Sequence, residues 1–140
     1  MLSKEFPPNI EQLRRIFPIN EQTHPVFTYG ETIHAPYHEK LPPDIIEHEQ
    51  IHIKQQKEYQ SPDIWWNKYI LDTDFRLLQE LEAYSHQYQW IKSISNGKIA
   101  NEALIEMASN LSSPLYRLNI SYGHAEKLIK NYGKATNDKS

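Results

Sequence analysis

The residues of this 140-residue chain that most clearly could do chemistry form one short run, His48-Glu49-Gln50-Ile51-His52. On a helix, residues four apart lie one above the other with Cβ atoms about 6 Å apart, so both imidazoles can bind one metal ion. Glu49 follows the first histidine by one position, which places its carboxylate beside the ion. There it can act as general base toward a water that the metal activates. The spacing therefore predicts a metal-dependent hydrolytic site with His48 and His52 as ligands.

A catalytic zinc ion takes three protein ligands and a water, so a third donor has to come from elsewhere in the fold. The chain has no cysteine, which restricts the ligands to imidazole and carboxylate. The best source is a later predicted helix that could pack antiparallel to the first. On it, Glu80 shares a face with the small Ala83, whereas Glu82 points roughly 160° away from Glu80. Glu80 is therefore the preferred third ligand, and Glu82 is the alternative.

Peptide hydrolysis also needs a hydrogen-bond donor within about 3 Å of the developing oxyanion. Tyr116 is the first candidate and His124 the second. Both residue types also serve purely structural roles, so the choice stays open. His86 is six residues after Glu80, which turns it away from the face of that ligand and predicts a surface histidine.

Helices have to position these groups, and the sequence predicts a mainly α fold with one short β-hairpin. Pro42-Pro43-Asp44 favours the start of a helix that reaches about Tyr59 and carries both histidines on its apolar side. β-Branched and aromatic residues around Gly30 predict a hairpin within residues 26–34, just before that helix. Further helices are predicted at residues 9–17 with an Asn9 cap, 61–70 with a tryptophan pair as core, 72–95 before a stop at Asn96-Gly97, 101–110, and 121–133.

Composition excludes several function classes. The net charge of −3 and the scattered lysines and arginines leave no basic surface for a phosphate backbone, so no nucleic-acid partner is expected. No run approaches the ~18 apolar residues of a membrane span, and no signal-peptide core is present, which favours a cytoplasmic protein without a membrane partner. The length fits one compact domain over residues 1–140, with flexible ends at about 1–7 and 134–140.

The HExxH run, followed by Glu80 and Ala83, resembles the gluzincin clan of zinc metallopeptidases, in which a glutamate from a following helix completes the site. Within that clan, the chain looks most like small phage and bacterial proteins classed as metallopeptidases. The matching pieces span about residues 28–129 and are Thr28-Tyr29-Gly30-Glu31-Thr32-Ile33, His48-Glu49-Gln50-Ile51-His52 with Gln55-Gln56, Trp65-Trp66-Asn67-Lys68-Tyr69, Phe75-Arg76 through Ala83, and, more weakly, Leu111-Ser112-Ser113-Pro114-Leu115-Tyr116.

The resemblance implies a small zincin-like helical domain with one Zn²⁺ ion on His48, His52 and Glu80, and with Glu49 as general base. It also implies a peptide or protein substrate. The chain departs from large gluzincins in lacking a second subdomain, which puts deep-cleft specificity in doubt.

The leading hypothesis is therefore a zinc metallopeptidase in which an extended substrate lies along the hairpin edge. The alternative is a non-catalytic zinc-binding helical module in which the metal fastens the HExxH helix to the Glu80 helix. A third hypothesis is a metal-free helical interaction protein. The sequence gives neither the substrate nor the oligomeric state.

Overall fold

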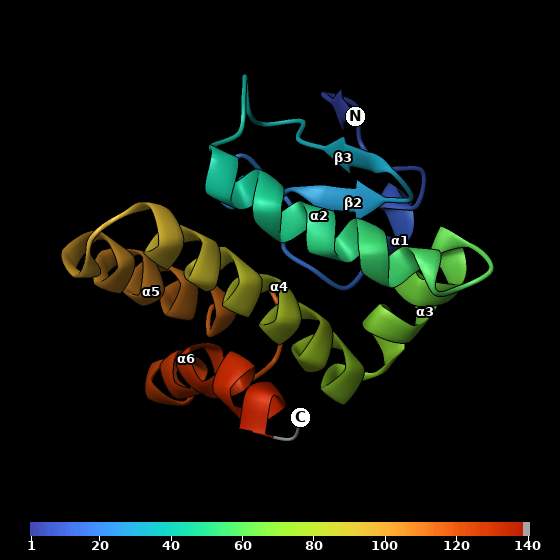
Figure 1. Ribbon diagram of the computed structural model, residues 1–140. Coiled ribbons are helices and arrows are strands. Elements are labelled where there is room, and N and C mark those ends of the chain that lie inside the picture. The colour runs from blue at the N-terminus through green and yellow to red at the C-terminus, as the bar shows by residue number, and fades with distance from the viewer. Residues whose placement is uncertain (139–140) are drawn as a thin grey trace.

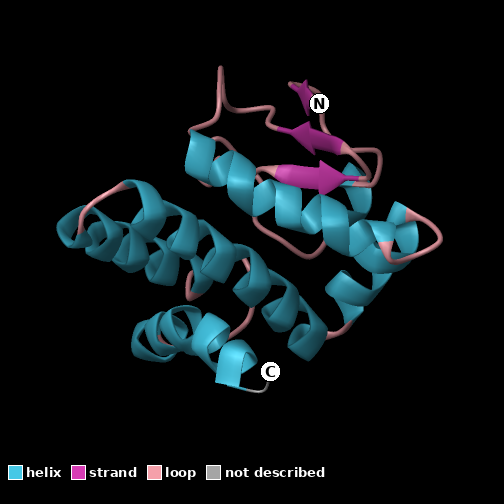
Figure 2. Ribbon diagram, viewed as in Figure 1, coloured by secondary structure: helices cyan, strands magenta, loops and turns pink. Residues whose placement is uncertain are grey.

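The computed structural model of the protein consists mainly of helices. It describes the backbone of residues 1–138 and the side chains of residues 1–132. The described residues form six helices and a three-stranded sheet, which confirms the predicted mainly α class (Figure 2). Residues 139–140, the end of the segment 134–140 for which flexibility is expected, lie outside the described residues. None of the helices in the described part is both long and apolar enough to span a bilayer.

The sheet has the strand order β1-β3-β2, with β1 at Leu2–Ser3, β2 at Phe27–Tyr29 and β3 at Thr32–His34. Strands β2 and β3 form the predicted hairpin, in which Tyr29 pairs with Thr32. Gly30 opens the two-residue turn with φ +64°, the positive angle that a type II′ turn requires at this position.

Strand β1 is missing from the sequence prediction, which expects residues 1–7 to be a flexible end. Instead Leu2 pairs with Ile33 in a parallel arrangement, and Pro7 is fully buried. A two-residue strand is too short to show the alternation by which strands are recognised, so the sequence carries no signal for it.

Helix α2 (Pro43–Lys57) begins and ends close to the predicted positions and lies against the sheet (Figure 1). Its buried residues include His48, Glu49 and His52, as the helical period predicts. Its other side packs against α4 (Thr73–Ile94), so α2 lies between the sheet and α4.

Two short helices close one end of the molecule. Helix α1 (Ile10–Arg14) and helix α3 (Pro62–Leu71) share a core with β2, and Trp65 and Trp66 lie inside it as predicted. The predicted Asn9 cap is wrong, because the Asn9 side chain makes no hydrogen bond to the helix. Its ψ of 22° lies outside the extended region from which an N-cap side chain reaches the first turn.

Helices α4, α5 (Gly97–Leu111) and α6 (Tyr122–Asp138) build a second core around residues such as Leu104 and Ile129. Asp72 caps the start of α4, since its side chain accepts a hydrogen bond from the Phe75 amide. Two predicted boundaries are wrong. Asn96 caps the start of α5 by accepting from the Ile99 amide, so α5 begins before residue 101, and α6 continues through Gly133 to Asp138.

Candidate metal centre

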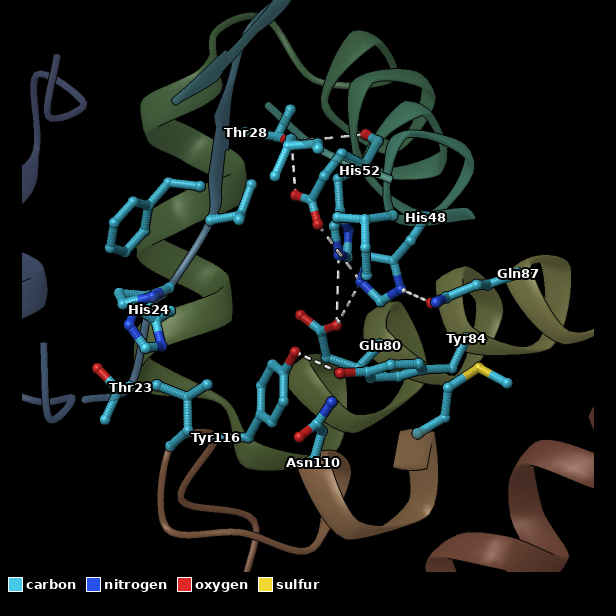
Figure 3. A pocket seen from close by; sticks show the side chains of 18 of the residues that line it. Thr23, His24, Thr28, His48, His52, Glu80, Tyr84, Gln87, Asn110 and Tyr116 are labelled. Carbon is cyan, nitrogen blue, oxygen red and sulfur yellow. Dashed lines mark hydrogen bonds and ion pairs between the residues drawn. The ribbon is translucent and has the colours of Figure 1, made fainter. Parts of the chain in front are cut away.

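The two histidines of α2 lie buried at the contact with α4, each only 4% exposed. Aromatic rings fix their orientation. The Tyr84 ring packs edge-on against His48 with centroids 4.4 Å apart, and the Trp65 ring packs against His52 at 5.5 Å. Because the rings are held from the side, their Nε2 atoms face α4 and Glu80 (Figure 3).

One carboxylate oxygen of Glu80 meets both histidines. The Oε1 atom of Glu80 lies 3.2 Å from Nε2 of His48 and 3.3 Å from Nε2 of His52. In a tetrahedral zinc site with bonds of about 2.0–2.1 Å, neighbouring ligand atoms are about 3.3 Å apart. The structure thus brings together the three residues that the sequence nominates as ligands, and it places the Glu80 oxygen at the separation from each histidine that one small ion requires.

Glu49 is close to the same centre, and the ligand atoms of His48, Glu49 and His52 lie within 4.8 Å of one another. Two observations favour Glu80 over Glu49 as the third ligand. The nearest Glu49 oxygen is 3.7 Å from Nε2 of His48, farther than Glu80. The other Glu49 oxygen accepts a 2.8 Å hydrogen bond from the Thr28 hydroxyl on β2, which holds the carboxylate beside the site.

The buried ionisable groups of the centre strongly affect one another's pKa values. Burial opposes ionisation of both partners, but their mutual attraction raises the pKa of His52 to about 9 and holds the pKa of Glu80 far below its usual range. Burial raises the pKa of Glu49, and the nearby histidines only partly offset this. Two ring nitrogens and a carboxylate oxygen that share one centre need a positive charge between them, either a proton or a metal ion.

Each candidate ligand has its second polar atom satisfied by another residue. Nδ1 of His48 lies 3.0 Å from Oε1 of Gln87, and Nδ1 of His52 lies 2.7 Å from Oε1 of Gln55. The Tyr69 hydroxyl donates a 2.6 Å hydrogen bond to Oε2 of Glu80. These contacts leave Nε2 of each ring and Oε1 of Glu80 for an ion, as hydrogen-bond partners of the ligand side chains do in metal sites.

A cleft of about 750 Å³ reaches the centre. One wall consists of residues 22–28, which lead into and include part of β2, and the other includes Asn110 at the end of α5 and the following Tyr116 (Figure 3). His24 and His38 also line the cleft. A substrate entering between these walls would meet the Glu49 carboxylate and the three candidate ligands together.

The structure separates the two oxyanion candidates. Tyr116 lines the cleft, and its hydroxyl lies 2.7 Å from that of Tyr84. Burial raises the pKa of both phenols, so both stay protonated, and because one hydroxyl donates to the other, the pair has one hydrogen left to donate. His124 is exposed on α6 and is not among the cleft residues.

The alternative third ligand and the predicted surface histidine lie outside the centre. Glu82 is exposed and accepts a hydrogen bond from Gln55, so it is not a ligand. His86 is half-exposed and pairs with Glu47 at 3.0 Å.

Several supporting residues have no role assigned to them in the sequence prediction. Gln55 is three residues after His52, and Gln87 is seven after Glu80, so helical spacing alone places each on the face of a ligand. That signal was available. Tyr69 and Thr28 could not be found in this way, because they come from α3 and β2 and their contact with the site depends on the tertiary fold.

Arg76 is another residue without a predicted role, and it is 4% exposed. Its guanidinium donates to the backbone oxygens of Tyr69, Ile70, Tyr116 and Arg117 at 2.7–3.1 Å. It thereby ties the end of α3, which carries Tyr69, to the loop that carries Tyr116. Arg117 has a positive φ of 52°, so this loop holds an unfavourable backbone conformation that the two hydrogen bonds to Tyr116 and Arg117 help to maintain.

Comparison with known proteins adds no relative to this description. No protein-family model, no curated protein and no solved structure matches the chain. The resemblance to the gluzincin clan therefore stays a prediction, and the geometry of His48, His52 and Glu80 alone supports a metal centre.

Proposed function

We propose that this protein is a zinc-dependent hydrolase of peptide bonds, with His48, His52 and Glu80 as zinc ligands and Glu49 as general base. One observation carries the proposal. A single Glu80 oxygen lies 3.2 and 3.3 Å from the two Nε2 atoms, with the Glu49 carboxylate held alongside, at the base of a cleft. A structural ion would need Glu80 close to both histidines, but it would need neither the Glu49 carboxylate beside them nor the cleft.

The donor set favours zinc. Two imidazoles and one carboxylate form one of the ligand sets that catalytic zinc sites use, with a fourth position left for water or substrate. Magnesium and calcium prefer sets composed of oxygen atoms, which two histidines do not provide. The absence of cysteine fits an imidazole and carboxylate site.

Zinc bound here would lower the pKa of a water to about 7 and polarise a substrate carbonyl. The protein's own residues carry the proton. Thr28 fixes one Glu49 oxygen, which leaves the other facing the centre to accept a proton from the attacking water and return it to the leaving nitrogen. The Tyr84 and Tyr116 hydroxyls bond to each other, so the pair has one free hydrogen, and we assign the Tyr116 hydroxyl as its donor to the oxyanion.

The substrate path differs from simple strand addition along β2. The Thr28 carbonyl, on the outer edge of the hairpin, already accepts hydrogen bonds from Gln56 and Trp66 at 2.7 and 3.0 Å. That part of the edge is therefore occupied. We place the substrate along the preceding segment, residues 22–27, which lines the cleft opposite Asn110 and Tyr116.

The test is the substitution Glu49→Gln, measured as zinc content and as cleavage of a mixed peptide library by mass spectrometry. We expect zinc to remain and cleavage to be lost. The matched control is Glu47→Gln on the same helix, whose carboxylate binds His86 and lies outside the cleft. Cleavage that survives Glu49→Gln unchanged would show that the base assignment is wrong.

A purely structural zinc ion is the second candidate, because the three ligands join α2 to α4 and are nearly inaccessible. In that case the wild-type protein would hold zinc and lose thermal stability without it, yet cleave no peptide in the library. Glu49→Gln would then have no activity to remove. A spectroscopic measurement that finds four protein ligands on the zinc ion would also favour the structural role, because a structural site has no position open to water.

A further inference from the structure

Each candidate histidine ligand is connected to a carboxylate through a buried glutamine. On one side, Gln87 accepts from Nδ1 of His48 at 3.0 Å and donates from Nε2 to Asp44 at 2.8 Å. On the other side, Gln55 accepts from Nδ1 of His52 at 2.7 Å and donates from Nε2 to Glu82 at 3.0 Å. We call these contacts the Gln87 bridge and the Gln55 bridge.

The donor and acceptor roles in each bridge are fixed from the carboxylate inward. An ionised carboxylate can only accept hydrogen bonds, so the amide nitrogen of Gln87 has to face Asp44. The amide oxygen must then face the ring, and an oxygen can only accept. Nδ1 of His48 therefore carries the hydrogen, and Nε2 keeps the lone pair that a metal ion needs.

The same reasoning applies to the Gln55 bridge, with one difference. The Gln55 amide nitrogen donates both to the Glu82 carboxylate and to the backbone oxygen of Gln79 at 3.0 Å. Both partners are acceptors, so the amide is oriented twice over. His52 is thereby held in the same tautomer even if one of the two outer contacts is lost.

We propose that Asp44 and Glu82, which do not touch the metal position, set the metal-binding tautomer of His48 and His52 through Gln87 and Gln55. This inference rests on the proposed metal site and assigns positioning roles to residues outside it. It also gives Glu82, which is not a ligand, a place in the same centre.

The arrangement avoids burying further charge. Gln55 and Gln87 are 6% and 3% exposed, and each is neutral, whereas the carboxylate of Glu82 is exposed and that of Asp44 is half-buried. A carboxylate in contact with each ring would add two buried negative charges beside Glu49 and Glu80, at a large desolvation cost. The amides transmit the orientation while the outer carboxylates stay near water.

The first experiment measures zinc affinity by competition with a chromophoric chelator in Gln87→Leu and Gln55→Leu. Loss of a residue that hydrogen-bonds a metal ligand typically weakens metal binding about 10–100-fold, and we expect a loss in this range for each variant. The matched control is Gln56→Leu, which removes an equally buried amide from the same helix but one that bonds Thr28 and Gly30. Gln56→Leu should lower the melting temperature without changing the zinc affinity of the folded protein.

The second experiment reads the tautomer directly. In the cobalt-loaded protein, each ligand histidine bound through Nε2 should give one exchangeable, paramagnetically shifted proton NMR signal from its Nδ1–H. Both signals should exchange slowly with water in the wild-type protein. In Gln87→Leu one of the two should exchange rapidly or disappear, a change that a general loss of stability would not confine to one histidine.

The third experiment tests the outer carboxylates with Asp44→Ala and Glu82→Ala. We expect each variant to lose less zinc affinity than the glutamine variants do. Asp44→Ala should lose more than Glu82→Ala, because in Glu82→Ala the Gln79 backbone oxygen still orients the Gln55 amide. The control is Glu47→Ala, which removes a carboxylate of α2 that lies outside both bridges.

The outcomes separate the inference from the proposed function. If the wild-type protein does not bind zinc or cobalt, both fail. If the wild-type protein binds zinc and Gln87→Leu and Gln55→Leu bind it equally well, the proposed site stands and the bridges are overturned. Weaker binding in the glutamine variants, with unchanged affinity in Gln56→Leu, supports the inference.

Discussion

Oε1 of Glu80 lies 3.3 Å from Nε2 of His52, although 28 positions separate the two residues in the chain. The contact joins α2 to α4, and the same oxygen lies 3.2 Å from His48. A buried carboxylate oxygen that faces two imidazole nitrogens is unfavourable without a cation between them. The stability and activity of the protein should therefore depend on metal, on pH and on the neighbouring side chains.

The first prediction concerns thermal stability. Because zinc binds only the folded state in this account, zinc at about 100 times its Kd should stabilise the protein by about 2.7 kcal/mol. For a domain of this size, that raises Tm by roughly 10 °C, which scanning calorimetry with and without a chelator measures. His48→Ala should abolish the response. His86→Ala, which changes a histidine outside the centre, should keep it, and a response that survives His48→Ala would contradict the ligand assignment.

The second prediction concerns pH in the metal-free protein. Burial alone would lower the pKa of His52, but Glu80 raises it to about 9, so the ion pair contributes fully below the unfolded value of about 6.5 and is lost as pH rises through 9. The depressed pKa of Glu80 has the opposite sign, with stability lost as pH falls below about 4.3. The raised pKa of Glu49 also makes the folded state less stable as pH rises above about 4.3.

Together these shifts place the maximum stability of the metal-free protein between about pH 4.5 and 6.5. Urea unfolding in the presence of a chelator should give a lower midpoint at pH 9 than at pH 6. The extra stability from zinc should grow over the same interval, because the metal no longer competes with a proton on His52. A metal-free midpoint that rises from pH 6 to pH 9 would contradict the assigned ion pair.

The third prediction concerns Tyr116. If its hydroxyl, paired with that of Tyr84, donates to the oxyanion, Tyr116→Phe should lower kcat about 10²–10³-fold while zinc affinity stays unchanged. Steady-state kinetics on a peptide found in the library experiment, combined with chelator competition, measures both quantities. His124→Gln is the matched control, and it should leave kcat as it is. Equal kcat values for Tyr116→Phe and wild type would rule out this role for Tyr116.

The fourth prediction concerns Arg76. Arg76→Met keeps most of the apolar contact with the rings of Phe17 and Tyr69 but leaves four backbone oxygens without their donor. Each buried unsatisfied group typically costs about 1–3 kcal/mol, so we expect a loss of at least about 3 kcal/mol in urea unfolding. Arg14→Met, at an exposed ion pair with Glu11, should change stability by less than about 1 kcal/mol. If Arg76→Met lowered the free energy of unfolding by as little as Arg14→Met, the four hydrogen bonds of Arg76 would not be needed for stability.

Helical periodicity explains why so much of the centre was predictable. The spacing of His48, Glu49 and His52 determines which side of α2 they share, and the same period distinguishes Glu80 from Glu82 on α4. The hairpin was predictable because Gly30 supplies the positive φ that its turn needs. In each case the information is local, within about two helical turns or one β-turn.

The missed features depend on contacts between distant segments or on competing local signals. Asn96 suits both the end of one helix and the start of the next, and the hydrogen bond from the Ile99 amide decides for the start of α5. Strand β1 exists through its pairing with β3, and Thr28 reaches Glu49 only after the hairpin has docked on α2. Arginine side chains are mostly exposed in proteins, and no local pattern predicts that Arg76 is buried. Only the fold brings the carbonyls of Tyr69 and Tyr116 to its guanidinium.

The most direct test of the metal centre is an anomalous difference map, recorded at the zinc absorption edge, from crystals grown with zinc. We predict one strong peak within about 2.0–2.2 Å of Nε2 of His48, Nε2 of His52 and Oε1 of Glu80, with Glu49 outside bonding distance. A peak located elsewhere, for example between His24 and His38, or one coordinated by Glu49 in place of Glu80, would contradict the account.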